Sequence, residues 1–160
     1  IVPSAMLSTV SAISAQNIGA GNMERAKRTM RTAMMITTGY GVVCAVVLQF
    51  IPQLAVGIFT DNAQVLAQGA DYLRGYVWDC IFAGLHFCFS GFFTACGFSV
   101  ISFIHNSVSI VCARIPLAWL SSTLYPETLY PMGLSTCIGS MLSCLICVGV
   151  YWWMKKKAYF

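Results

Sequence analysis

Residues 128–154 read TLYPMGLSTCIGSMLSCLICVGVYWWM and contain no Asp, Glu, Lys or Arg. A helix needs about 20 apolar residues to cross the hydrocarbon core of a bilayer, so this stretch is long enough for one crossing. Two further intervals, 32–60 and 80–113, are also free of these charged residues. The three intervals predict an all-α polytopic membrane protein, because a helix satisfies its own backbone hydrogen bonds within lipid.

The composition of the whole chain supports this prediction. Of 160 residues, 58% are hydrophobic and 9% are charged. A soluble domain carries about 25% charged residues, so this chain has too few to cover a surface in contact with water. The same composition argues against intrinsic disorder, a basic nucleic-acid-binding domain and a small disulfide-linked secreted fold.

The uncharged intervals divide into membrane spans. We predict complete spans at about 33–57, 74–96, 99–122 and 131–154, after a partial segment at 1–16. The interval 80–113 is too long for one crossing, and we place a break near 96–99. The partial segment is too short to cross alone, so we expect the chain to begin inside an earlier helix. We therefore expect residues 1–160 to form one helical bundle, or a piece of one, without a second domain.

The basic residues predict the orientation of this bundle. They gather in two clusters, Arg25, Lys27, Arg28 and Arg31 after the first segment and Lys155, Lys156 and Lys157 after the last span. An even number of crossings separates the clusters, so both lie on one side. The opposite connections hold acidic residues, with Arg74 at the entry of the next helix. The positive-inside rule therefore predicts a cytoplasmic C-terminus, in a multi-pass protein of the plasma (inner) membrane.

The eight cysteines raise the question of a redox or metal site. Cys144 and Cys147 have CxxC spacing, but they lie inside an apolar span, and no second pair has zinc-ribbon spacing. Ser135, Gly139, Ser143 and Cys147 recur every four residues, and small side chains allow helices to approach closely. We interpret this row as a helix-packing seam and predict no metal site. A membrane-embedded thiol oxidoreductase is a distant alternative, which needs a cysteine pair that is reachable from water.

Four ionisable residues lie inside the predicted spans: Asp79, His86, His105 and Arg114. Such residues are costly in hydrocarbon and normally face a partner or a water-filled cavity. At about 1.5 Å per residue, Asp79 lies about 8 Å and Arg114 about 12 Å below the outer ends of adjacent helices. An ion pair between them is therefore geometrically available. The pair could serve transport, or it could merely neutralise two awkward charges.

His86 follows Asp79 by seven residues and therefore lies on the same helix face, near mid-membrane. A histidine titrates near neutral pH, which suits a proton relay or a cation-gated site, but a lone histidine is more often a satisfied group of the core. We interpret His105 as structural and Pro116 as a candidate hinge. The sequence contains no nucleophile–base constellation, phosphate-binding loop or paired catalytic carboxylates, so we predict that the protein is not an enzyme.

Several motifs carry a resemblance to a known family. They are SAQNIGAGN at 14–22 with ERAK at 24–27, FSGFFTACG at 89–97, RIPL at 114–117 and PMGL at 131–134. In this order and spacing, the chain resembles the multidrug and toxic compound extrusion (MATE) transporters over nearly its whole length. The resemblance implies the end of helix 8 to helix 12 of a twelve-helix transporter. The chain is then a partial C-terminal lobe whose N-terminal lobe is missing.

The resemblance also implies a function. Family members are antiporters that export lipophilic or cationic organic compounds in exchange for sodium ions or protons. We hypothesise that Asp79, His86 and Arg114 line this lobe's side of the pathway for substrate or ions. No cofactor is implied beyond the coupling ion, and the expected partners are a small-molecule substrate, the lipid bilayer and the N-terminal lobe, not nucleic acid.

Two alternatives remain open. A lipid-linked precursor flippase of related architecture would favour several cationic side chains in the cavity to hold phosphate, and here only Arg114 is available. The chain could also be a fragment that does not transport.

Overall fold

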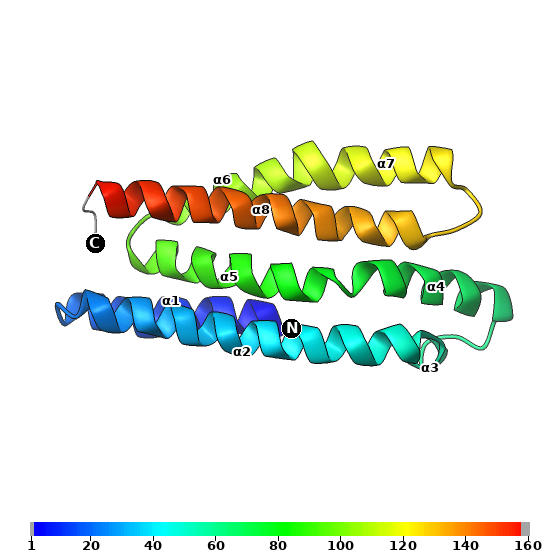
Figure 1. The fold of residues 1–160 in the computed structure, drawn as a ribbon, viewed down its shortest axis with the longest axis horizontal. Helices are drawn as coiled ribbons and strands as arrows, with labels where there is room; N and C mark the ends of the chain where they lie inside the picture. Colours follow the sequence, from blue (N-terminus) through cyan, green and yellow to red (C-terminus); the bar gives the residue numbers. More distant parts are fainter. Residues whose placement is uncertain (1, 158–160) are drawn as a thin grey trace.

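The computed structural model describes residues 2–157, which form a bundle of long helices that lie side by side (Figure 1). The elements in chain order are α1 (Val2–Gly19), α2 (Met23–Phe50), α3 (Pro52–Gly57), α4 (Ala63–Tyr76), α5 (Asp79–Ala95), α6 (Ser99–Ser109), the π-helix η1 (Ile110–Arg114), α7 (Ile115–Leu124) and α8 (Tyr130–Lys156). Within the described residues there is no strand. The predicted all-α architecture is confirmed.

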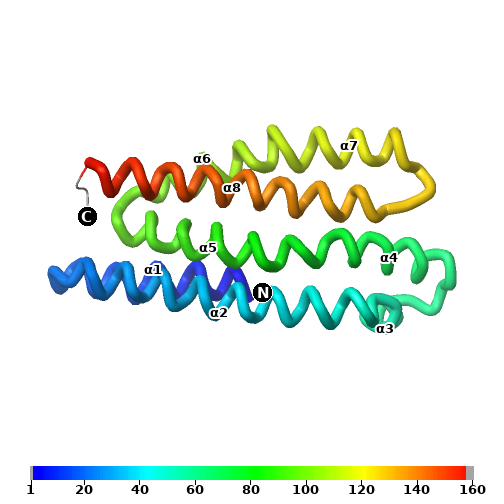
Figure 2. The backbone as a smooth tube through the Cα atoms, in the orientation of Figure 1, coloured from blue at the N-terminus to red at the C-terminus, as the bar shows by residue number. Residues whose placement is uncertain are grey.

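Within the described residues, three continuous helices are long and apolar enough to cross a membrane. They are α2, the run Ser99–Leu124 from α6 through η1 to α7, and α8. A fourth crossing results if α4 and α5, which meet at an angle of 47°, act as one broken span. The backbone trace in Figure 2 shows this broken pair lying between α2 and α8. These helices agree with the predicted helical membrane bundle.

The observed α2 differs from the span predicted at 33–57. It begins earlier, at Met23, because Asn22 caps it by accepting a hydrogen bond from the Arg25 amide at 3.1 Å. It ends at Phe50, because the next residue but one, Pro52, has no N–H and disfavours helical geometry at Ile51. Hydropathy located the apolar part of this helix, whereas the cap and the proline set its ends.

The span predicted at 74–96 also needs a correction. Its helix begins at Ala63, where the Asn62 side chain accepts hydrogen bonds from the amides of Gln64 and Val65 at 3.0 and 3.3 Å. It is then interrupted at residues 77–78, between α4 and α5. Neither feature changes the hydrophobicity of the stretch, so composition alone did not indicate them.

The break predicted near residues 96–99 is confirmed. Gly97 has a φ of +85°, a left-handed conformation that costs glycine little because it has no Cβ. The Gly97 amide donates to the Thr94 carbonyl at 3.0 Å, and the Phe98 amide donates to the Phe93 carbonyl at 2.8 Å. These bonds satisfy carbonyls at the end of α5 and turn the chain into α6.

The connections of the bundle lie at two ends. The α1–α2 turn, the α5–α6 turn and the end of α8 share one end, and the α2–α4 and α7–α8 connections share the other (Figure 1). The cluster that starts at Arg25 and the cluster that starts at Lys155 therefore lie at the same end. This is the arrangement that the even number of crossings predicted.

Many large apolar side chains face outward, although Phe92, Phe93 and Met154 form part of the core, and several small polar ones face inward. Phe50, Phe59 and Phe103 are more than 70% exposed, whereas Ser140 and Ser143 are buried. This distribution suits a surface that contacts lipid tails, because packing between membrane helices relies on small residues. Ser135, Gly139, Ser143 and Cys147 are all buried on α8. The predicted packing seam is therefore confirmed.

Backbones approach most closely where Gly75 of α4 meets Gly133 of α8. A Cβ added to Gly133 would overlap the Tyr72 carbonyl and lie 2.7 Å from the Tyr76 amide nitrogen. Both obstacles are backbone atoms, which cannot rotate away as a side chain could. The two glycines thus set the distance between α4 and α8.

Gly133→Ala is expected to destabilise the protein by roughly 1–3 kcal/mol, because the added methyl group forces these two helices apart. Gly149→Ala is the matched control on the same helix, since a Cβ there meets no described atom within 4 Å. Thermal unfolding in detergent measures both variants. Equal midpoints for the two would show that the close contact does not limit stability.

Candidate functional site

Asp79 stands at the bend between α4 and α5. It is the first residue of α5 and only 5% exposed. A helix N-terminus carries partial positive charge, which favours a carboxylate at this position. The amides of Cys80 and Ile81 bond back to the carbonyls of Val77 and Trp78 at 3.1 and 3.3 Å, forming the tight turn that precedes the helix. The bend therefore positions an acidic side chain inside the bundle.

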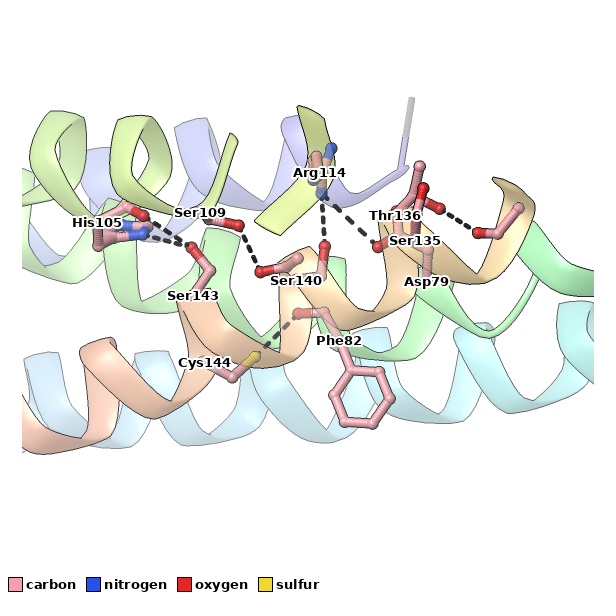
Figure 3. Close-up of polar contacts among 12 residues, drawn as sticks. Asp79, Phe82, His105, Ser109, Arg114, Ser135, Thr136, Ser140, Ser143 and Cys144 are labelled. Atoms are coloured by element: carbon pink, nitrogen blue, oxygen red, sulfur yellow. Dashed lines mark hydrogen bonds and ion pairs between the residues drawn. The ribbon is translucent and has the colours of Figure 1, made fainter. Parts of the chain in front are cut away.

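Arg114 faces Asp79 from the end of η1, as the sequence predicted. Its Nη2 lies 3.7 Å from Asp79 Oδ1 and donates a hydrogen bond to Ser140 Oγ at 2.6 Å (Figure 3). A distance of 3.7 Å exceeds the 2.7–3.2 Å range of a hydrogen bond, so the contact with Asp79 is a charge interaction. Among the described residues, Asp79 Oδ1 and Arg114 Nε have no hydrogen-bond partner. The pair is thus close but incompletely satisfied.

The position of the Arg114 side chain depends on α8 and on the local widening of its own helix. Pro116 has no N–H, and its ring conflicts with regular helical hydrogen bonding in the turn before it. The π-helix η1 occupies that turn, and the Ile115 amide bonds to the Ile110 carbonyl. Gly139 leaves room for the arginine, since a Cβ there would overlap the Arg114 side chain. Ser109, the last residue of α6, also donates to the Gly139 carbonyl, which connects the start of η1 to α8.

A cavity of about 610 Å³ brings the three predicted site residues together. Asp79, His86 and Arg114 all line it. Its other lining side chains include the aromatic residues Tyr40, Tyr76 and Phe87 and the polar residues Asn106, Cys44 and Cys80. One cavity between α1, α2, α5 and η1 therefore holds a carboxyl group, a guanidinium group and an imidazole beside aromatic side chains.

The two histidines play different roles. His105 is hydrogen-bonded at both nitrogens, with Nε2 2.8 Å from Ser90 Oγ and Nδ1 2.8 Å from Ser143 Oγ, as expected for a structural residue. His86 is 2% exposed, and neither ring nitrogen has a hydrogen-bond partner among residues 2–157. Among the described residues, His86 thus lacks the hydrogen bonds that a satisfied core group would have.

The surroundings of His86 are aromatic. Its ring stacks on Phe87 with 4.6 Å between centroids and meets His105 edge-on at 5.9 Å. A buried polar group without a partner is costly, so such a group normally has a ligand or a water as its partner. Its place on the wall of the cavity makes His86 available to either.

Comparison with protein families now places the chain. A family model described as MatE matches residues 1–120 of the 160. The chain belongs to the MatE family. MatE proteins are transporters rather than enzymes, and Asp79, His86 and Arg114 all lie within the matched range. Comparison with curated proteins and with solved structures gave no match.

Sequence reasoning missed part of the site in this MatE chain. Ser140, fully buried, holds the Arg114 guanidinium, and it follows directly after Gly139 of the predicted seam. A small polar residue beside a packing seam was the available signal. Tyr40 and Tyr76 also line the cavity, but nothing in their spacing distinguished them from tyrosines that face lipid.

The CxxC pair of this MatE chain, Cys144 and Cys147, is explained by packing. Cys147 is fully buried, and Cys144 donates a hydrogen bond from Sγ to the Phe82 carbonyl at 3.2 Å (Figure 3). A redox pair must be reachable from water, which the burial of Cys147 opposes. Within residues 2–157, no group of three or more ligating side chains could hold a metal ion.

Proposed function

We propose that this chain is part of a secondary active antiporter, which exports lipophilic or cationic organic compounds in exchange for sodium ions or protons. The observation that supports the proposal is the shared cavity, where Asp79, His86 and Arg114 each carry a polar atom that lacks a hydrogen-bond partner among the described residues. We also propose that the bundle crosses the plasma membrane and that its basic end, with the end of α8, lies on the cytoplasmic side.

The geometry suggests how an ion would act at this site. A sodium ion or a proton that reaches Asp79 competes with the Arg114 guanidinium for the same carboxylate. Arg114 can withdraw without losing every partner, because it keeps its hydrogen bond to Ser140. Coupling then requires that the ion and the substrate favour opposite conformations, since a ligand that binds both equally shifts neither.

The cavity suits an organic cation. Its volume of about 610 Å³ lies within the range of about 300–1,000 Å³ that is common for ligand pockets. The rings of Tyr40, Tyr76 and Phe87 offer apolar contact and attract positive charge through their π faces. Asp79 adds a negative charge once Arg114 has moved.

The alternative of a lipid-linked precursor flippase has less support. A phosphate-bearing headgroup calls for several cationic side chains, and of the described lining residues only Arg114 is basic apart from His86. Asp79 on the same wall would repel the phosphate. We therefore favour the antiporter.

Reconstitution of the complete protein in liposomes tests the proposal. An imposed sodium or proton gradient is expected to drive ethidium transport that protein-free liposomes do not show. A variant with alanine at Asp79, His86 and Arg114 is expected to lose the response to the gradient, and Asp61→Ala, in an exposed connection, is expected to keep it. Unchanged transport in the triple variant would exclude these three residues from the pathway.

A further inference from the structure

A second cavity lies between α1 and α2, near the turn that joins them. Its volume is about 1020 Å³, and among the described residues none lines both this cavity and that of Asp79. The turn between Gly19 and Met23 joins the two helices, which run antiparallel. Residues close to the turn therefore lie at one end of the hollow and residues far from it at the other. Its lining residues lie between positions 6 and 13 of α1 and between positions 22 and 36, which are the N-cap and the first half of α2. We call this hollow the α1–α2 groove.

One end of the α1–α2 groove is strongly basic. Arg25, Arg28 and Arg31 line it and are exposed. Within residues 2–157, none of the three lies within ion-pair distance of a carboxylate. The acid at the mouth, Glu24, is bound to Lys27 at 2.8 Å and so is already neutralised. Arg25 and Arg28 thus face the groove without a carboxylate at ion-pair distance, whereas Arg31 lies within electrostatic range of Glu24.

The other end of the groove is mainly apolar. It is lined by Met6 and Val10 of α1 and by Ala33 and Ile36 of α2, with Ile13 midway along α1, and the hydroxyl groups of Thr9 and Thr32 lie among them. Ile13 and Ile36 are 42% and 53% exposed, so they offer apolar surface rather than core packing. The groove therefore changes from cationic to apolar along the helix axes, away from the turn.

This gradient matches the shape of one membrane component. A phospholipid carries its phosphate at the membrane boundary and its acyl chains toward the centre, which is the order of Arg25 and Arg28 near the turn and of Met6 and Ile36 farther from it. Guanidinium groups bind phosphate through two parallel hydrogen bonds. Basic pockets between membrane helices on the cytoplasmic side bind acidic headgroups for this reason.

We propose that the α1–α2 groove is a binding site for an anionic phospholipid, with the phosphate on Arg25 and Arg28 and an acyl chain against Ile13 and Ile36. A zwitterionic lipid fits less well, because its ammonium group would meet the uncompensated charge of the same arginines. The site is separate from the Asp79 cavity and does not depend on the proposed transport function.

Native mass spectrometry of the complete protein in detergent tests this site, with dioleoyl phosphatidylglycerol and dioleoyl phosphatidylcholine as probes. The wild type is expected to bind phosphatidylglycerol more tightly. Replacing both arginines, as R25Q/R28Q, is expected to weaken that binding by roughly thirtyfold, because each basic residue near the surface contributes to the attraction. The matched control K156Q/K157Q removes two charges at the same end of the bundle but outside the groove, and is expected to change little.

Further variants keep the test decisive if R25Q/R28Q does not fold. R25K/R28K keeps the charge and is expected to keep the preference for phosphatidylglycerol, whereas Ile36→Asn is expected to weaken binding several-fold at the apolar end. The site is excluded if R25Q/R28Q binds like the wild type, or if the wild type does not distinguish the two lipids. Displacement of the lipid by an equal concentration of inorganic phosphate would indicate a free-anion site instead and would also overturn the proposal.

Discussion

Asp79→Asn is expected to reduce gradient-driven efflux roughly a hundredfold. The coupling ion can no longer stabilise the conformation that it favours, and without that stabilisation such a minor conformation is populated at about 1%. Asparagine has nearly the same shape as aspartate, but it has no negative charge to attract a cation and no carboxyl group to bind and release a proton. The Arg114 guanidinium keeps its hydrogen bond to Ser140 in this variant. The protein is therefore expected to fold and to lose its coupling.

The measurement compares efflux with and without an imposed sodium or proton gradient, in liposomes that contain equal amounts of folded protein. Asp61→Asn is the matched control, since it makes the same chemical change at an exposed position in the connection before α4. It is expected to transport like the wild type. If Asp79→Asn responded fully to the gradient, the coupling ion would have to act elsewhere in the protein.

The contact between Asp79 and Arg114 could be predicted from the sequence because a helix has a fixed rise per residue. Two helices joined by the tight turn at Gly97 must run antiparallel, and Asp79 and Arg114 lie 18 and 17 residues from that glycine, which places them at similar depth although the outer end predicted near residue 74 was wrong. The structure has these side chains 3.7 Å apart. Depth along a membrane helix is thus readable from sequence once the turn between two helices is known.

The bend at residues 77–78 and the π-helix η1 could not be predicted in the same way. No proline or glycine marks the bend itself, and the residues there are as apolar as their neighbours. The sequence did mark Pro116 as a candidate hinge, but the distortion lies in the turn before it, where the helix widens. Pro116 thus indicated that a distortion lies nearby but not its form, and the bend, whose two arms both contact α8, has no such local signal.

The state of His86 depends on contacts between helices in the same way. Ser90 and Ser143 come from α5 and α8, and both bond His105 rather than His86. The sequence analysis interpreted His105 as structural, which its two hydrogen bonds confirm, but spacing did not show whether His86 would find hydroxyl partners. The unsatisfied histidine is consequently a result that only the three-dimensional arrangement supplies.

The Asp79–Arg114 pair also has consequences for stability, because removing one partner leaves the other charge buried alone. Arg114→Met keeps an unbranched side chain of similar length, so it removes the charge while filling most of the space beside Gly139. This variant is expected to be less stable by roughly 2–3 kcal/mol. The expected loss is below that for a fully buried pair, since the Arg114 side chain is 30% exposed.

The double variant D79N/R114M separates the effect of charge from the effect of packing. With both charges removed, no uncompensated carboxylate remains, and most of the lost stability is expected to return although transport does not. A double-mutant cycle of unfolding in detergent, built from the wild type, both single variants and the double variant, measures the coupling energy between the two residues. A coupling energy near zero would mean that the two charges do not stabilise each other, and Arg114 would then owe its position to Ser140 and Gly139 alone.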